Sequence, residues 1–183
     1  MSTDPAVLAR KAARIRLLLL DVDGVLTDGR ILLHADGSES KQFSIRDGTG
    51  IVWARRAGIT TGILSARHSG ATAVRATQLG IQIVRQQSGD KLEMYNELLE
   101  QERLTNEDVA FMGDDVLDLP VLSSVGLSAA PADAVPEVCA RVNWVSSRVG
   151  GDGAVRELVE LILRAQGRWE DLVRSYLPEG ARS

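Results

Sequence analysis

Short apolar runs alternate with amphipathic stretches along most of the chain. The apolar runs predict strands at Ile15–Asp21, Thr60–Ser65, Gln82–Arg85, Val109–Gly113, Gly126–Ala130 and Val142–Trp144. A helical period between and after them predicts helices at Gly48–Ala57, Ser69–Leu79, Gly89–Glu102, Val116–Ser123 and Ala154–Ala165. Strands that alternate with helices are typical of βαβ units, whose crossovers are right-handed. The pattern therefore predicts an α/β fold built on a parallel sheet.

One segment, residues 29–45, interrupts this alternation. Two extended runs flank Asp36-Gly37, a pair that is typical of a β-hairpin turn. A two-stranded hairpin is marginally stable alone, and this one carries apolar residues without an evident covering layer. We therefore expect a projecting hairpin that packs on another subunit; the alternative is a hairpin folded onto its own sheet. The apolar residues are Ile31, Leu33, Phe43 and Ile45.

Length and composition set limits on the class of protein. The chain has 183 residues, 44% hydrophobic and 25% charged, which suits a single domain over residues 1–183. Aromatic residues make up only 4% and the net charge is −4, so nucleic acid and anionic membranes are disfavoured as partners. The single Cys139 excludes an internal disulfide, and no apolar window reaches the roughly 18 residues of a membrane span. We expect a cytoplasmic protein.

Polar residues gather where the predicted strands end or the helices begin. Such edges carry the binding sites of open α/β sheets. There are four of these stations, and in chain order they hold Asp21 and Asp23, then Ser65, then Lys91, and then Asp114, Asp115 and Asp118.

These residue types suit phosphoryl transfer. One carboxylate can attack phosphorus, and a second can exchange the proton of the leaving oxygen and of water. Mg²⁺ prefers oxygen ligands, and a hydroxyl and a lysine can stabilise the phosphoryl oxygens. Ordinary alternatives exist: an Asx turn needs one aspartate, an N-cap explains Asp114 or Asp115 alone, and Lys91 could be solvated. One cap does not explain three aspartates together.

The four stations resemble the four motifs of the haloacid dehalogenase superfamily of phosphatases, with its three-layer Rossmann-like fold. The motifs read Asp21-Val22-Asp23-Gly24-Val25-Leu26-Thr27, then Ser65, Lys91 and Gly113-Asp114-Asp115-xx-Asp118. The resemblance implies Asp21 as nucleophile and Asp23 as general acid and base. It implies Mg²⁺ on the Asp21 carboxylate, the Asp23 backbone carbonyl and Asp114, with Asp115 and Asp118 in support. Ser65 and Lys91 would bind the phosphoryl group.

A narrower resemblance, to the 3-deoxy-D-manno-octulosonate 8-phosphate phosphatase family, covers nearly the whole chain. It rests on Thr27-Asp28-Gly29, the hairpin, Arg46-Asp47-Gly48-Thr49-Gly50, Gly113–Pro120 and a glycine-rich segment, Gly150–Glu157, in the tail at 148–183. The resemblance implies a hydrolase of lipopolysaccharide precursor synthesis without a cap domain, and a homotetramer whose hairpins meet and whose subunits cover each other's sites. Only 41 residues separate Asp23 from Ser65 and 22 separate Lys91 from Asp114, which leaves no room for a cap.

The substrate is less firmly indicated than the chemistry. Arg46 and Arg67 are candidates for binding a substrate carboxylate, because guanidinium groups bind carboxylates bidentately; ordinary surface arginines are the alternative. Asp47, beside Arg46, is a further candidate substrate-binding residue. Ala66, Thr49 and Asp152 depart from the family pattern. A phosphatase that acts on a nine-carbon acidic sugar phosphate is therefore an alternative. Two alternatives of a different class are a receiver-type phospho-switch and a catalytically silent structural relative.

Overall fold

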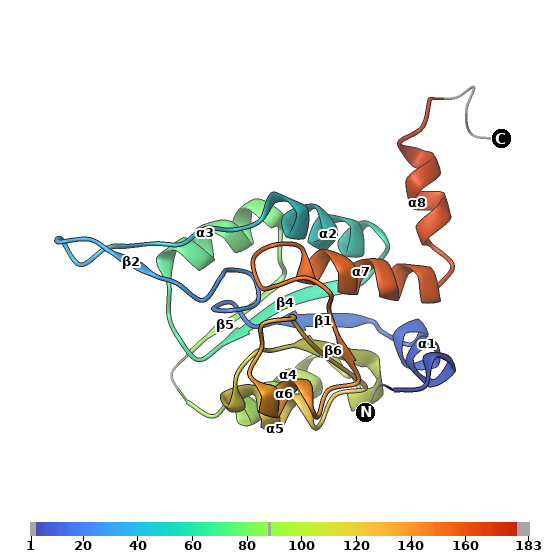
Figure 1. Cartoon of the computed structure of the whole chain (residues 1–183), viewed down its shortest axis with the longest axis horizontal. Helices are drawn as coiled ribbons and strands as arrows, with labels where there is room; N and C mark the ends of the chain where they lie inside the picture. The colour runs from blue at the N-terminus through green and yellow to red at the C-terminus, as the bar shows by residue number, and fades with distance from the viewer. Residues whose placement is uncertain (1–2, 88, 179–183) are drawn as a thin grey trace.

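A six-stranded parallel sheet forms the centre of the molecule (Figure 1). The computed structural model describes residues 3–87 and 89–178. Across the sheet the strands are β5 (Ile83–Gln86), β4 (Thr60–Ser65), β1 (Leu17–Leu20), β6 (Val109–Met112), β7 (Leu127–Ala130) and β8 (Trp144–Val145). A separate two-stranded ribbon, β2 (Leu32–Leu33) and β3 (Glu39–Ser40), is antiparallel.

Helices cover both faces of the sheet and complete three layers. Around one face lie α1 (Pro5–Ala13), α2 (Ile45–Arg56), α3 (Gly70–Leu79), α7 (Ala154–Ala165) and the start of α8 (Trp169–Ser175). The other face packs against α4 (Lys91–Glu102), α5 (Leu119–Leu122) and α6 (Pro136–Cys139). Short 3₁₀ turns, η1 (Asn106–Asp108) and η2 (Val116–Asp118), flank β6.

The four leucines of β1 explain why this strand is central. Successive side chains of a strand point to opposite faces. Leu18 and Leu20 accordingly enter the core under α2 and α7, whereas Leu17 and Leu19 enter the core under α4 and α5. All four side chains are fully buried, so β1 is anchored on both faces.

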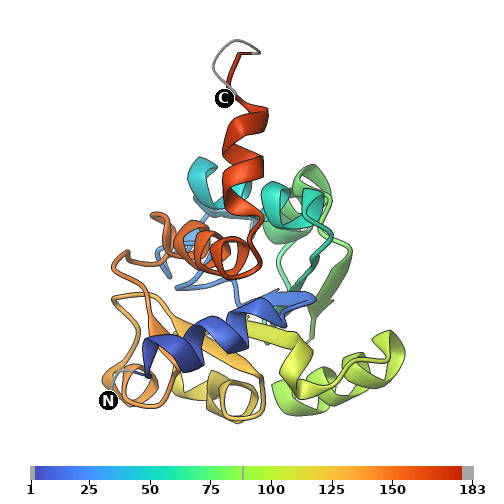
Figure 2. The same cartoon turned by 90° about the vertical axis from the view of Figure 1, so that its right-hand side faces the viewer.

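The predicted fold class is confirmed, and the six predicted strands all appear within one or two residues of their expected bounds. In the described part of the chain, three α-helices were not predicted. They are α1, which begins at the Asp4 cap; α6, which is only four residues long; and α8 at the end of the chain. Figure 2 shows α8 extending away from the sheet layers.

The hairpin differs in detail from the prediction. Its paired strands are only two residues long each, and Ile45 starts α2, capped by Ser44, instead of lying on the ribbon. Phe43 packs against the main core, so this part of the segment is covered by its own chain. Ile31, Leu32 and Leu33 remain exposed on the ribbon, which projects beyond the sheet in Figure 1.

The register of the sheet brings the predicted stations together. Leu20 of β1 pairs with Ile63 of β4 and with Met112 of β6, so these strands end at the same edge. Among the described residues no cap domain follows β1 or α4; the first interval holds the hairpin and α2. None of the described helices has the length and apolar character needed to cross a bilayer.

Candidate active site

Asp21 and Asp23 occupy the turn that follows β1. The backbone N–H of Asp21 still donates to the Met112 carbonyl at 3.0 Å, as a continuation of the sheet, and its side chain is buried. Gly24 then adopts a φ of +93°, which a side chain would strain. A Cβ on Gly24 would also lie 2.1 Å from Oδ2 of Asp114. Glycine is therefore required for the β6 carboxylate to approach the β1 turn.

Lys91, at the first position of α4, joins two of the stations. Its Nζ donates to Oδ1 of Asp21 at 2.8 Å and to Oδ1 of Asp118 at 2.5 Å. The Lys91 side chain is only 7% exposed, so its charge is compensated by carboxylates and not by water. The pairing explains why a lysine begins a helix where the macrodipole favours an acid.

Asp118 organises the loop after β6. Its Oδ2 accepts from the backbone N–H of Asp114 at 3.0 Å and of Asp115 at 3.3 Å, and its side chain is 1% exposed. Asp115 is instead exposed and caps η2, accepting from Val116 N–H. The ordinary capping interpretation therefore holds for Asp115, whereas Asp114 and Asp118 lie close to Asp21 in one group of carboxylates.

Burial and neighbouring charges shift the pKa values of these groups. Burial raises the pKa of Asp21 to about 6, although Lys91 opposes the shift. Burial, followed by the charges of Asp21 and Asp118, raises the pKa of Asp114 to about 7. Burial alone would lower the pKa of Lys91, but attraction by Asp21 and Asp118 outweighs it and the pKa is raised.

A small divalent cation fits this cluster. Ligand oxygens of Asp21, Asp114 and Asp118 all lie within 4.8 Å of one another. Oδ1 of Asp114 is buried and has no hydrogen-bond partner among the residues that the structure describes. Buried polar atoms normally have a partner, and Mg²⁺ binds through one or two carboxylates together with water and phosphate oxygens. A bound cation would give the Asp114 oxygen the partner that it lacks. It would also displace the protons that the raised pKa values favour on Asp21 and Asp114.

A cavity of about 190 Å³ lies over the cluster. Its walls come from all four predicted stations and are Asp21, Asp23, Ser65, Ala66, Arg67, Lys91, Asp114, Asp115, Leu117 and Asp118. Ser65 ends β4, is 4% exposed, and its Oγ accepts from the backbone N–H of Arg67 at 3.3 Å. A hydroxyl, a lysine and an arginine thus face the carboxylates, which is the arrangement a phosphoryl group requires.

Two further charged residues reach this site from the hairpin. Lys41 pairs with Asp23, Nζ to Oδ1, at 2.5 Å, and Glu39 forms an ion pair with Arg67. Neither hairpin residue was predicted as part of the site. Glu39 and Lys41 lie on either side of Ser40, but no spacing in the sequence indicates which aspartate or arginine they would contact.

Asp47 does not line this cavity. It is fully buried, and its carboxylate accepts from the backbone N–H groups of Gly153 at 3.1 Å and Arg156 at 2.8 Å. Burial raises its pKa, although those N–H groups oppose the shift. Asp47 therefore holds the glycine-rich segment at the start of α7.

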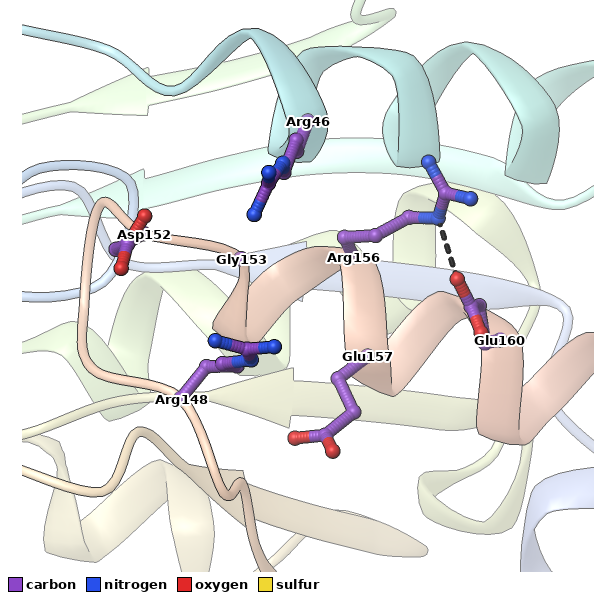
Figure 3. Close-up of a pocket in the computed structure, with 7 residues that line it drawn as sticks. All are labelled: Arg46, Arg148, Asp152, Gly153, Arg156, Glu157 and Glu160. Carbon is purple, nitrogen blue, oxygen red and sulfur yellow. Dashed lines mark hydrogen bonds and ion pairs between the residues drawn. The ribbon is translucent and has the colours of Figure 1, made fainter.

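Arg46 lies in a second cavity, of about 330 Å³. Figure 3 shows it extending from α2 toward the space that Arg148 and Asp152 border. Arg156 borders the same cavity and bonds Glu160 at 2.7 Å. Within one chain, only Arg67 of the predicted substrate ligands lines the acidic cavity; contact of Arg46 and Asp47 with substrate stays a prediction.

The parallel sheet, with its carboxylates after β1 and β6 and its lysine before α4, defines a phosphatase-like member of the haloacid dehalogenase-like hydrolases. A model of that description matches residues 60–158. The 3-deoxy-D-manno-octulosonate 8-phosphate phosphatase KdsC of Escherichia coli K12 is 44% identical over 161 residues, 88% of this chain and 86% of that protein. The chain belongs to this family of phosphatases.

Solved structures agree. The phosphatase of the same name from Yersinia pestis is 43% identical with a TM-score of 0.88, covering 90% of this chain and 89% of that one. The Moraxella catarrhalis phosphatase, solved with a magnesium ion, a phosphate ion and a KDO molecule, is 31% identical with a TM-score of 0.92. That match covers 95% of this chain and 100% of the other.

Proposed function

We propose that this chain, acting as a single domain, is a Mg²⁺-dependent phosphatase that hydrolyses 3-deoxy-D-manno-octulosonate 8-phosphate to the free sugar acid and phosphate. The observation that carries the proposal is the buried Asp21–Lys91–Asp118 cluster beside Asp114, in one cavity with Ser65. Family membership over most of the chain supports the choice of substrate.

Asp21 and Asp23 divide the chemistry. A carboxylate oxygen of Asp21 attacks phosphorus, and the bond between phosphorus and the sugar oxygen breaks while Asp23 donates a proton to that oxygen. Asp23 then takes a proton from a water molecule whose oxygen attacks the aspartyl-phosphate. Phosphate leaves and the Asp21 carboxylate is restored.

The other residues stabilise charge. Lys91 and Ser65 bind the phosphoryl oxygens, and Asp118 keeps Lys91 oriented. The Asp21 carboxylate, the Asp23 backbone carbonyl and Asp114 would hold Mg²⁺, with Asp115 and Asp118 in support. When bound, the ion neutralises phosphate charge during the displacement. Arg67 lines the cavity, and we expect its guanidinium group to bind the carboxylate of the sugar.

The substrate is tested by phosphate release, with Mg²⁺, from the octulosonate ester beside nine-carbon acidic and neutral sugar phosphates. A kcat/KM of about 10⁴ M⁻¹s⁻¹ or more for the octulosonate ester, well above the others, is expected. Preference for a nine-carbon ester would favour the alternative substrate, with Ala66, Thr49 and Asp152 as the first residues to exchange. Absence of hydrolysis across the panel would contradict phosphatase activity and favour a silent relative.

Mg²⁺ is expected to raise the melting temperature more at pH 7.5 than at pH 5. Asp21 and Asp114 bind protons more tightly in the folded chain, so the metal-free fold loses stability as pH rises from 3.8 to about 7. Mg²⁺ at about 100 times its dissociation constant should stabilise the folded chain by about 2.7 kcal/mol. At pH 5 the ion has to displace those protons, so the stabilisation should be smaller. Differential scanning fluorimetry measures both shifts. Equal shifts at the two pH values, or an unchanged shift in Asp114→Asn, would contradict the site.

The hairpin supports assembly into a homotetramer. Leu32 is 62% exposed and Leu33 is 70% exposed on the ribbon, an apolar surface that a second copy would cover. The net charge of −4 and the single cysteine support a cytoplasmic enzyme without nucleic-acid or membrane partners.

Replacing Leu32 and Leu33 together by serine is expected to dissociate the assembly. Each buried leucine contributes about 1.5–3 kcal/mol, so the dissociation constant should rise by about two orders of magnitude or more. Sedimentation velocity measures the change, with Val173→Ser on α8 as the control for loss of an exposed apolar side chain. A wild-type monomer with full activity, or an unchanged assembly in the double variant, would contradict it.

A further inference from the structure

Lys41 is a buried lysine that the proposed chemistry does not use. It follows β3, on the arm of the hairpin that returns to the body of the molecule (Figure 1). Its side chain is 1% exposed, and its Nζ lies 2.5 Å from Oδ1 of Asp23. An ammonium group is rarely buried without an opposite charge, because desolvation is costly. The ion pair with Asp23, together with attraction by the nearby Glu39, therefore accounts for the buried charge of Lys41.

Asp23 is held differently from the other acids of the cavity. Asp21 and Asp118 share Lys91, and Asp114 receives no hydrogen bond at Oδ1. Among the contacts of the described residues, Lys41 makes the one side-chain hydrogen bond to the Asp23 carboxylate. The turn after β1 carries Asp23, and the hairpin supplies the side-chain hydrogen bond that orients its carboxylate.

A second ion pair fixes the same arm of the hairpin. Glu39 binds Arg67, the cavity residue after β4, and this hydrogen bond lowers the pKa of Glu39 and raises that of Arg67. Oε1 of Glu39 and Nη1 of Arg67 are buried without a hydrogen-bond partner among the described residues. Two charged contacts, two residues apart at the end of β3, thus join the hairpin to two residues that line the cavity, Asp23 and Arg67.

We propose that Lys41 is a positioning residue: its ammonium holds the Asp23 carboxyl toward the oxygen that leaves phosphorus, and so makes the hairpin part of the reaction machinery of its own subunit. This inference rests on the proposed function, in which Asp23 protonates the leaving sugar oxygen. It assigns to the hairpin a task that is separate from subunit assembly.

The leaving group distinguishes positioning from a structural role. A sugar alkoxide is a poor leaving group and needs protonation, whereas p-nitrophenolate leaves without it. Rapid-quench measurement of the first turnover isolates transfer to the enzyme for each ester. In Lys41→Met, transfer from the octulosonate ester should slow by about 10²-fold, the lower range for general acid catalysis, while transfer from p-nitrophenyl phosphate changes by less than about threefold. Lys41→Arg keeps the charge and should recover most of the loss.

Gln42→Met, an exposed neighbour on the same arm, is the matched control and should behave as wild type. Equal slowing of both esters in Lys41→Met, or loss of its cooperative melting or assembly, would assign Lys41 a structural role and overturn the inference. Unchanged transfer from both esters would also overturn it. Failure of the wild-type enzyme to cleave the octulosonate ester would instead overturn the proposed function.

Discussion

Asp21→Asn is expected to abolish turnover while leaving the metal-free chain at least as stable as wild type. The amide cannot form the phosphoryl ester that the mechanism requires, so phosphate release should fall by at least about 10⁴-fold, as for other lost nucleophiles. Its carbonyl oxygen can still accept from Lys91 Nζ, which now lies 2.8 Å from Oδ1 of Asp21. The variant therefore loses the nucleophile without losing the hydrogen bond that holds the cluster together.

The stability of Asp21→Asn follows from the pKa of the residue it replaces. Because burial raises the pKa of Asp21 to about 6, its ionised form destabilises the folded chain at pH 7.5. Removing that charge also relieves its repulsion with Asp118 and Asp114. The melting temperature of Asp21→Asn in EDTA should be equal to or higher than that of the wild type. The increase in melting temperature on adding Mg²⁺ should be smaller. Asp171→Asn, an exposed site on α8, is the control; ordinary turnover in Asp21→Asn would refute the mechanism.

Asp23→Asn is expected to separate the two half-reactions. Leaving-group protonation and water activation both use this carboxyl, and general acid or base catalysis typically contributes about 10²–10⁴-fold. With p-nitrophenyl phosphate, which needs little protonation, the first step should survive and the second should stall. The expected result is a burst of about one p-nitrophenolate per site followed by a slow steady rate. Stopped-flow absorbance measures this, and a normal steady rate without a burst would contradict the assigned role.

The elements that carry the site were predictable because strong local signals specify them. The run of four leucines requires burial on both faces, which fixes β1 at the centre and delivers Asp21 to the sheet edge. Lys91 at a helix start conflicts with the helix dipole, and the two carboxylates it contacts resolve the conflict. Such local inconsistencies between sequence and element are typical of functional sites.

Other contacts were not predictable because they join segments that the sequence leaves independent. The pairing of Lys41 with Asp23 depends on how far the hairpin arm bends back after β3, and a two-residue strand leaves no periodic signal. Asp47 belongs to a recognisable motif, but its cap on α7 bridges more than 100 residues of chain. Asp115 and Asp118 looked alike in the sequence, and only the loop geometry after Gly113 makes one a cap and the other a ligand of Lys91.

The measurement that tests the account most directly is the position of the phosphoryl group on the enzyme. Wild-type enzyme is mixed with the octulosonate ester and Mg²⁺, quenched in acid within the first turnover, digested and analysed by mass spectrometry. The account predicts a phosphoryl adduct on the peptide containing Asp21, sensitive to hydroxylamine and absent from Asp21→Asn. A full turnover of phosphate with no adduct, or an adduct on another residue, would contradict it.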